Sequence, residues 1–206
     1  TINEKLGEKQ IIAEDLGYIT KTVKKLLKDS GYPGMKVLEF AFDPEEETDY
    51  LPHVYDKNCV VYTGTHDNET LVQWYKGLDE ASKALTLEYM NNAHTPDAEK
   101  YWDFVRLAML STANTCIIPV QDYMGLGEEA RINFPSTLGN NWKWRMKSKM
   151  ISDELSKRIY ALTKLSGRLS DFMKEKEWKI KEAALKKAEE AKKLESKEEI
   201  EEVEDK

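Results

Sequence analysis

The residues with the greatest capacity for chemistry lie directly after short apolar runs. The stretch "YTGTHDNET" places a histidine, an aspartate, an asparagine and a glutamate in four consecutive positions after the run "CVVY". Other carboxylates follow similar runs: Glu14 and Asp15 after "QIIA", Asp43 after "MKVLEFAF", and Asp122 after "CIIPVQ". Two nearby carboxyl groups can perform retaining glycoside transfer, one as acid/base and one as nucleophile. A histidine with carboxylates can instead bind a divalent metal.

The elements that must position these side chains alternate between strands and helices. We expect strands at 10–14, 35–42, 59–63 and 116–121, because these runs are short and rich in β-branched residues. We expect one helix to follow Thr20 as N-cap and to end at Gly31. Further helices are expected at 80–89, at 97–113 with Thr95 as N-cap and Pro96 at the first position, and at 152–167. The alternation predicts an α/β fold with a parallel sheet, in which polar residues at the carboxyl ends meet in one crevice.

The spacing of the candidate residues favours sugar chemistry over metal or phosphate chemistry. The chain has three histidines and no H-x-x-H, H-E-x-x-H or D-x-D spacing, so we expect no metal and no cofactor. It also lacks a G-x-S-x-G nucleophile motif and a glycine-rich phosphate loop. Aromatic side chains near the loops could stack on pyranose rings, although they could equally belong to the core: Trp74, Tyr75, Tyr123, Trp142 and Trp144.

The composition limits the partners. A net charge of −7 argues against nucleic acid as a partner. No apolar run approaches the length of a membrane helix, and the first residues do not resemble a secretory signal. We therefore expect no membrane association and a cytoplasmic location. Cys59 and Cys116 lie in apolar runs and are expected to be buried, reduced thiols.

The C-terminal residues differ in composition from the rest. Residues 169–206 are mostly Lys and Glu with a thin apolar stripe, which predicts a charged helical or disordered tail. We expect the acidic end, from about Glu195, to be frayed or disordered. A solvated helix and a partner-binding coiled coil both remain open.

Six ordered motifs resemble the amylomaltases, the bacterial 4-alpha-glucanotransferases. They are "IIAEDLG", "PGMKVLEFAF", "YLPH", "VVYTGTHDNET", "PVQDYMGLGEEARIN" and "LGNNWKWR". The resemblance implies that residues 1–168 form the second half of a (β/α)8 TIM barrel, with about four strands. It also implies a hexosyltransferase that moves α-1,4-glucan segments between maltodextrins by double displacement, without a cofactor.

The resemblance also assigns roles to individual residues. Glu14 matches the family's general acid/base, and Asp67 matches the third carboxylate, which stabilises the transition state. His66 matches a histidine that binds the sugar. Asp43 and Asn141 lie where the family has substrate contacts. From the residues alone, Asp15 is expected to cap a turn or pair with a cation, Glu69 to begin a helix, and Asn68 stays open between a turn and a contact.

One part of the family pattern is absent. The family's nucleophile is an aspartate in an R-x-D-H motif, which the 206 residues do not contain. We therefore expect a fragment that is inactive alone, whose partner would be the missing N-terminal half of the barrel. The alternatives are a non-catalytic half-barrel that binds a glucan or a protein partner, and a hydrolase of the α-amylase clan.

Overall fold

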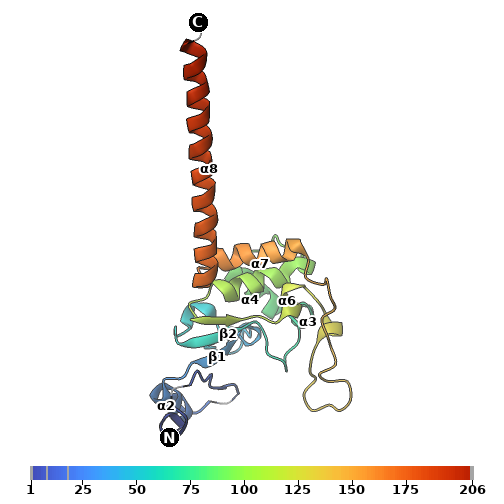
Figure 1. Cartoon of the computed structure of the whole chain (residues 1–206). Helices are drawn as coiled ribbons and strands as arrows, with labels where there is room; N and C mark the ends of the chain where they lie inside the picture. Colours follow the sequence, from blue (N-terminus) through green and yellow to red (C-terminus); the bar gives the residue numbers. More distant parts are fainter. Residues whose placement is uncertain (1, 8, 18, 205–206) are drawn as a thin grey trace. The chain divides into compact units, whose positions relative to one another are not determined.

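The computed structural model describes residues 2–7, 9–17 and 19–204 (Figure 1). The chain divides into two compact units, Thr1–Leu162 and Thr163–Lys206. Each unit is described below by itself. None of the helices in the described ranges is long and apolar enough to cross a membrane.

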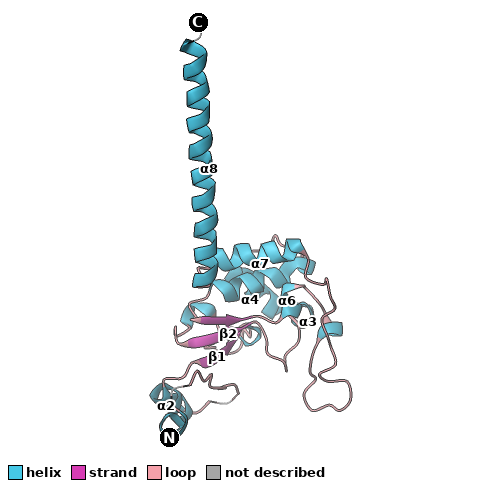
Figure 2. Cartoon of the chain, viewed as in Figure 1, coloured by secondary structure: helices cyan, strands magenta, loops and turns pink. Residues whose placement is uncertain are grey.

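A small parallel sheet lies at the centre of the first unit. Within the described residues it has three strands in the order β1 (Gly34–Val37), β2 (Cys59–Tyr62) and β3 (Thr115–Ile117), drawn as arrows in Figure 2. In the register Met35 pairs with Val60, and Val61 pairs with Cys116. The parallel sheet predicted from the alternation of runs is confirmed, whereas the half-barrel of about four strands stays a prediction.

The prediction of a strand at residues 10–14 is wrong. This segment is extended but is not paired as a strand, and a bond from the Ala13 N–H to the Pro33 carbonyl (2.9 Å) links it to the start of β1. Ile12 is 44% exposed, so the apolar run does not supply the buried face that a strand of this sheet needs.

Two other expected strands are shorter than predicted. After β1 the chain turns into the 3₁₀-helix η1 (Leu38–Phe40), and after β3 it turns into α6 (Val120–Tyr123). Pro119 immediately precedes α6 and has no N–H to donate to a neighbouring strand, so the ladder stops there. Glu39 and Gln121, two polar residues of the predicted strands, therefore lie in these short helices and not in the sheet.

Helices account for most of the remaining chain. The α-helices not yet named are α1 (Ile2–Leu6), α2 (Lys21–Ser30), α3 (Leu71–Gly77), α4 (Glu80–Met90), α5 (Lys100–Leu110), α7 (Asp153–Leu165) and α8 (Asp171–Glu204). Short 3₁₀-helices are η2 (Pro52–Val54), η3 (Asp97–Glu99) and η4 (Glu128–Ala130).

The helix starts test the capping predictions. The Thr20 side chain accepts from the Val23 N–H, and Gly31 ends α2 with φ of 71°, so both predictions for α2 are confirmed. Thr95 does not cap a helix, because its hydroxyl accepts from Asn92 Nδ2 at 2.8 Å. Residues 97–99 instead form η3, and α5 begins only at Lys100.

The core of the first unit is rich in aromatic side chains. Phe42 contacts Trp74 and Phe104, with ring centroids 6.1 and 5.8 Å away. Tyr75 is buried in the same cluster, and Tyr123 packs against it. These aromatic residues therefore belong to the core and not to a sugar-binding surface. Cys59 is buried as expected, while Cys116 is only partly buried.

The second unit is dominated by α8. The helix is lined by ion pairs one turn apart, such as Lys179 with Glu175 (2.6 Å) and Lys186 with Glu182 (3.0 Å). It continues to Glu204, and the expectation of a frayed or disordered acidic end from about Glu195 stays a prediction. Trp178 and Leu185 are 61 and 64% exposed, so these two members of the apolar stripe lie in solvent.

Candidate active site

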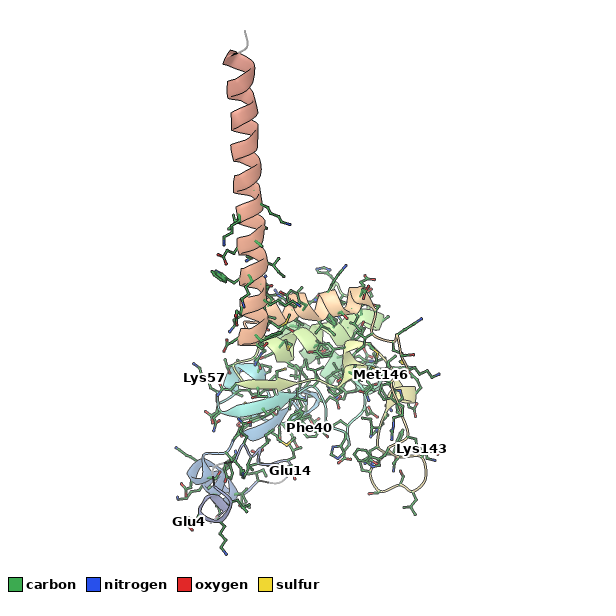
Figure 3. The ribbon with its side chains drawn as sticks, in the orientation of Figure 1. Glu4, Glu14, Phe40, Lys57, Lys143 and Met146 are labelled. Carbon is green, nitrogen blue, oxygen red and sulfur yellow. The ribbon has the colours of Figure 1, made fainter. Side chains whose placement is uncertain are left out.

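A cleft of about 890 Å³ lies at the carboxyl end of the sheet. Tyr62 and Ile117, the last residues of β2 and β3, line it. Glu14 and Phe40, both labelled in Figure 3, also line it. The position of the cleft is the one that the parallel sheet predicts, because polar residues beyond the strand ends converge there. The remaining lining residues belong mainly to 64–70, 117–122 and 130–132.

Glu14 is exposed to solvent at this cleft. Its carboxyl Oε1 accepts from the Leu16 N–H at 2.8 Å. The carboxyl group of the neighbouring Asp15 accepts from the N–H of Met35, the second residue of β1, at 2.6 Å. Asp15 therefore ties the segment of Glu14 to the start of β1, in place of the turn cap or cation pair expected from the sequence.

His66 and Asp67 line the same cleft on the loop between β2 and α3. Their side chains are about half exposed, and His66 Nε2 lies 3.3 Å from Asp67 Oδ2. The other carboxyl oxygen of Asp67, Oδ1, accepts from Asn133 Nδ2 at 2.6 Å. The His66 ring lies against Trp142, with centroids 5.1 Å apart. Both oxygens of Asp67 are thus engaged, which fixes the direction of the carboxylate.

Asn68 and Glu69 have structural contacts. Asn68 Oδ1 accepts from both the N–H and the hydroxyl of Thr65, which closes the turn that presents His66 and Asp67. Glu69 pairs with Arg131 at 3.1 Å and accepts from Gln73 at 3.1 Å. Glu69 precedes the N-cap Thr70, so the expected helix start is one residue later.

Two buried carboxyl groups lie beneath the loop. Asp122 is 1% exposed and accepts from the Thr63 hydroxyl (2.5 Å) and from the Leu71 N–H (2.9 Å). Burial raises the pKa of Asp122 to about 6, although these two hydrogen bonds act to lower it. One carboxylate therefore holds both ends of the loop that carries His66 and Asp67.

Glu39 is the second buried carboxyl group, at 7% exposure. Burial first, and then the charges of Asp122 and Glu69, raise the pKa of Glu39 well above its ordinary value, while Arg131 and Asn68 act to lower it. Its Oε1 lacks a hydrogen-bond partner among the described residues. Since a bare buried carboxylate is costly, this environment favours the neutral form of Glu39.

Asp43 and Asn141 are not among the residues that line the cleft. Asp43 is exposed, and its Oδ1 accepts from the Glu45 N–H at 2.8 Å in a turn. Asn141 Oδ1 accepts from the Phe134 N–H at 2.9 Å, and its Nδ2 donates to the Thr137 carbonyl at 3.2 Å. Their role as substrate contacts stays a prediction, and the bonds seen here are those of turns.

Three residues that contact the site were not predicted from the sequence: Arg131, Asn133 and Glu39. Arg131 and Asn133 stand in "EARIN", which follows no strand, so the rule of strand ends did not select them. Glu39 interrupts the apolar run "MKVLEFAF", and that interruption was the available signal. In the described part of the chain, no three His, Cys, Asp or Glu side chains converge as a metal site requires.

Comparison with known proteins was made by sequence and by structure. The sequence profile of the 4-alpha-glucanotransferases matches residues 1–156. The 4-alpha-glucanotransferase of Clostridium butyricum is 47% identical over 171 residues, which are 81% of this chain and 34% of that protein. The enzyme of the same name from Thermus thermophilus is 41% identical over 173 residues, or 82% of this chain and 35% of that protein.

Solved structures give the same relation. The amylomaltase from Streptococcus agalactiae in complex with acarbose aligns with a TM-score of 0.76 and 35% identity, over 82% of this chain and 34% of that one. The amylomaltase from Corynebacterium glutamicum, at 18% identity and a TM-score of 0.56, shares the fold. The chain thus spans about a third of the length of the relatives it matches. On the match along residues 1–156 and these identities, the chain belongs to the 4-alpha-glucanotransferase family.

Proposed function

We propose that the cleft holds an α-1,4-glucan across its scissile linkage, as part of a 4-alpha-glucanotransferase site. The observation that carries this proposal is that Glu14, His66 and Asp67, which come from segments far apart in the sequence, line one cleft. The acarbose complex of the Streptococcus agalactiae amylomaltase supports a maltodextrin-like ligand.

Glu14 acts in this proposal as the general acid/base. Its carboxyl group donates a proton to the glycosidic oxygen as the bond breaks, and then takes a proton from the hydroxyl of the acceptor glucan. Asp67 stays ionised and stabilises the positive charge that develops on the sugar ring. His66 donates to a sugar hydroxyl beside the cleaved linkage.

The attacking carboxylate comes from outside these 206 residues in this proposal. The sequence contains no R-x-D-H motif, which carries the nucleophile in the pattern that the chain otherwise resembles. Double displacement needs this second carboxylate to form the glycosyl intermediate. The purified chain should therefore bind a maltodextrin without transferring it.

The test is to mix the chain with maltotriose and to separate the products by chromatography. We expect neither glucose nor longer maltodextrins. The remaining two-thirds of the Clostridium butyricum relative, added as a second polypeptide, should bring activity that E14Q abolishes and the exposed control E46Q does not. Turnover by the chain alone would contradict the missing nucleophile.

A binding measurement separates the two remaining alternatives. Titration calorimetry with acarbose should show binding by the chain alone. Binding without activity in any mixture would favour a non-catalytic glucan-binding protein, while glucose without longer products would favour a hydrolase. Absence of acarbose binding, together with failure of the mixture, would overturn the proposed site.

A further inference from the structure

The segment from Arg131 to Trp142, here named the clamp segment, makes more contacts to the loop at 64–69 than the proposed chemistry uses. Arg131 Nη1 pairs with Glu69 at 3.1 Å, and its Nη2 donates to the Asp67 carbonyl oxygen at 3.1 Å. The guanidinium also lies 4.5 Å from the centre of the Phe134 ring. The Arg131 side chain is only 12% exposed, so its charge-assisted bond to Glu69 is partly shielded from solvent.

The clamp segment contacts each of the two residues at the tip of the loop. Asn133 holds Asp67 Oδ1 at 2.6 Å. Trp142 lies against the His66 ring at 5.1 Å, with the planes inclined by 37°. The Trp142 N–H donates to the Ile132 carbonyl at 2.7 Å, which places the two ends of the clamp segment together beside the loop.

Asn141 closes the clamp segment without touching the loop itself. Its Oδ1 accepts from the Phe134 N–H at 2.9 Å. Its Nδ2 donates to the Thr137 carbonyl at 3.2 Å and to the Thr137 hydroxyl at 3.1 Å. These bonds close the turn 134–141, whose tip includes the fully exposed Leu138. Trp142 follows directly with φ of 63°, a conformation that a non-glycine residue adopts only when its surroundings enforce it.

We propose that the clamp segment is a positioning device for His66 and Asp67, and that Asn141 acts in it as a positioning residue that sets Trp142 against His66. The proposal rests on the proposed function, because it deepens the role of the same two residues. It gives Asn141 a task that requires no contact with sugar. The physical reason is that a half-exposed side chain recognises a ligand well only if its neighbours fix its orientation beforehand.

The test reads the position of His66 directly and needs no sugar. A histidine ring stacked on tryptophan has its carbon-bound protons shifted upfield in the NMR spectrum, and H66Q identifies those signals among the three histidines. W142A should remove the upfield shift. N141A should also remove it, whereas the control N140A should leave it, since the Asn140 side chain accepts from the exposed Lys143 and makes no hydrogen bond to the loop at 64–69 among the residues described. N141D, which keeps the acceptor for the Phe134 N–H, should restore part of the shift.

Acarbose affinity provides the second measurement. N141A and N133A should each weaken binding about five- to tenfold, and N140A should not. If N141A weakens binding while the His66 signals stay in place, Asn141 is a direct sugar contact and the proposal is overturned. If the signals move but none of the variants binds acarbose, the clamp stands and the proposed function fails. Core methyl signals, such as those of Leu71, should stay unchanged in every variant, which separates a local release of the loop from unfolding.

Discussion

At the residue scale, two buried carboxyl groups lie next to the candidate site. Asp122 and Glu39 lie beneath the loop that carries His66 and Asp67, and each has a raised pKa for the same primary reason, burial. Two like charges in a buried region are costly together, so the charge of Asp122 adds to the rise in the pKa of Glu39. The two groups differ in their hydrogen bonds: Asp122 accepts one at each oxygen, whereas Glu39 Oε1 has no partner among the described residues.

The raised pKa of Asp122 predicts how stability depends on pH. Its pKa rises from 3.8 to about 6 on folding, so the folded state binds the proton more tightly. This contribution to stability is therefore fully present below pH 3.8 and is lost as pH rises through about 6.

The substitution D122N should remove this dependence. The amide Oδ1 can still accept from the Leu71 N–H, and the amide Nδ2 can donate to the Thr63 hydroxyl, which then turns its proton away. At pH 7 we expect the free energy of unfolding to rise by about 1–3 kcal/mol. Urea unfolding from pH 4 to 8 measures this, with the exposed E46Q as control. A slope between pH 4 and 6 equal to that of the parent chain would show that Asp122 does not titrate there.

Gly64 gives a second prediction at the residue scale. A Cβ at Gly64 would lie 2.8 Å from Glu39 Oε1 and 3.1 Å from Asn68 Cβ. We expect G64A to lower stability by about 1–3 kcal/mol, because the buried carboxyl group has little room to move.

A double-mutant cycle tests the cause. E39A removes the clashing oxygen, so G64A should cost clearly less in that background. G77A serves as the matched control, since its nearest neighbour would be 4.0 Å away. An equal cost of G64A with and without Glu39 would rule out this contact as the source.

At the element scale, two helices of similar capping differ in what they bury. Thr70 caps α3 by accepting from the Gln73 N–H, and Thr20 caps α2 by accepting from the Val23 N–H. Helix α3 places Leu71 and Tyr75 in the core, whereas α2 has no buried residue. Loss of the cap of α3 should therefore lower the stability of the whole first unit, whereas loss of the cap of α2 should only increase fraying at the start of that helix.

Thermal unfolding of T70A and T20A tests this difference. T70A should cost about 1 kcal/mol and lower the midpoint by roughly 2–4 °C. T20A should leave the midpoint nearly unchanged, while amide exchange in residues 21–24 becomes faster. Equal shifts of the midpoint in the two variants would mean that α2 is coupled to the core.

At the scale of the whole molecule, the core of the first unit is complete at Leu162. On helix α8 four large apolar side chains, those of Phe172, Trp178, Ile180 and Leu185, are between 61 and 72% exposed. Its stability comes from local ion pairs and not from a packed face.

Removal of residues 169–206 should therefore leave the first unit intact. We expect an unchanged unfolding midpoint and unchanged acarbose affinity, with a loss of helical signal in circular dichroism that corresponds to α8. A midpoint several degrees lower would show that the tail contributes to the stability of the first unit.

The sequence by itself determined the class of fold, the end of the sheet at which the cleft lies, and the family. Short β-branched runs and capping residues are local signals, and they located β2, the carboxyl end of the sheet and both ends of α2. The same signals selected His66 and Asp67, which follow β2, whereas Glu14 was selected after an apolar run that does not form a strand.

Only the tertiary structure decided which groups hold these side chains in place. The sequence around Ile12 predicts a strand, but Ile12 is 44% exposed and does not pack in the core. Thr95 is predicted to cap a helix, but its hydroxyl accepts a hydrogen bond from Asn92. Arg131 and Asn133 reach Asp67 across more than sixty intervening residues, and the burial of Glu39 and Asp122 follows from packing of several elements at once. The physical reason is that desolvation and long-range hydrogen bonds depend on neighbours in space, which the order of residues does not specify.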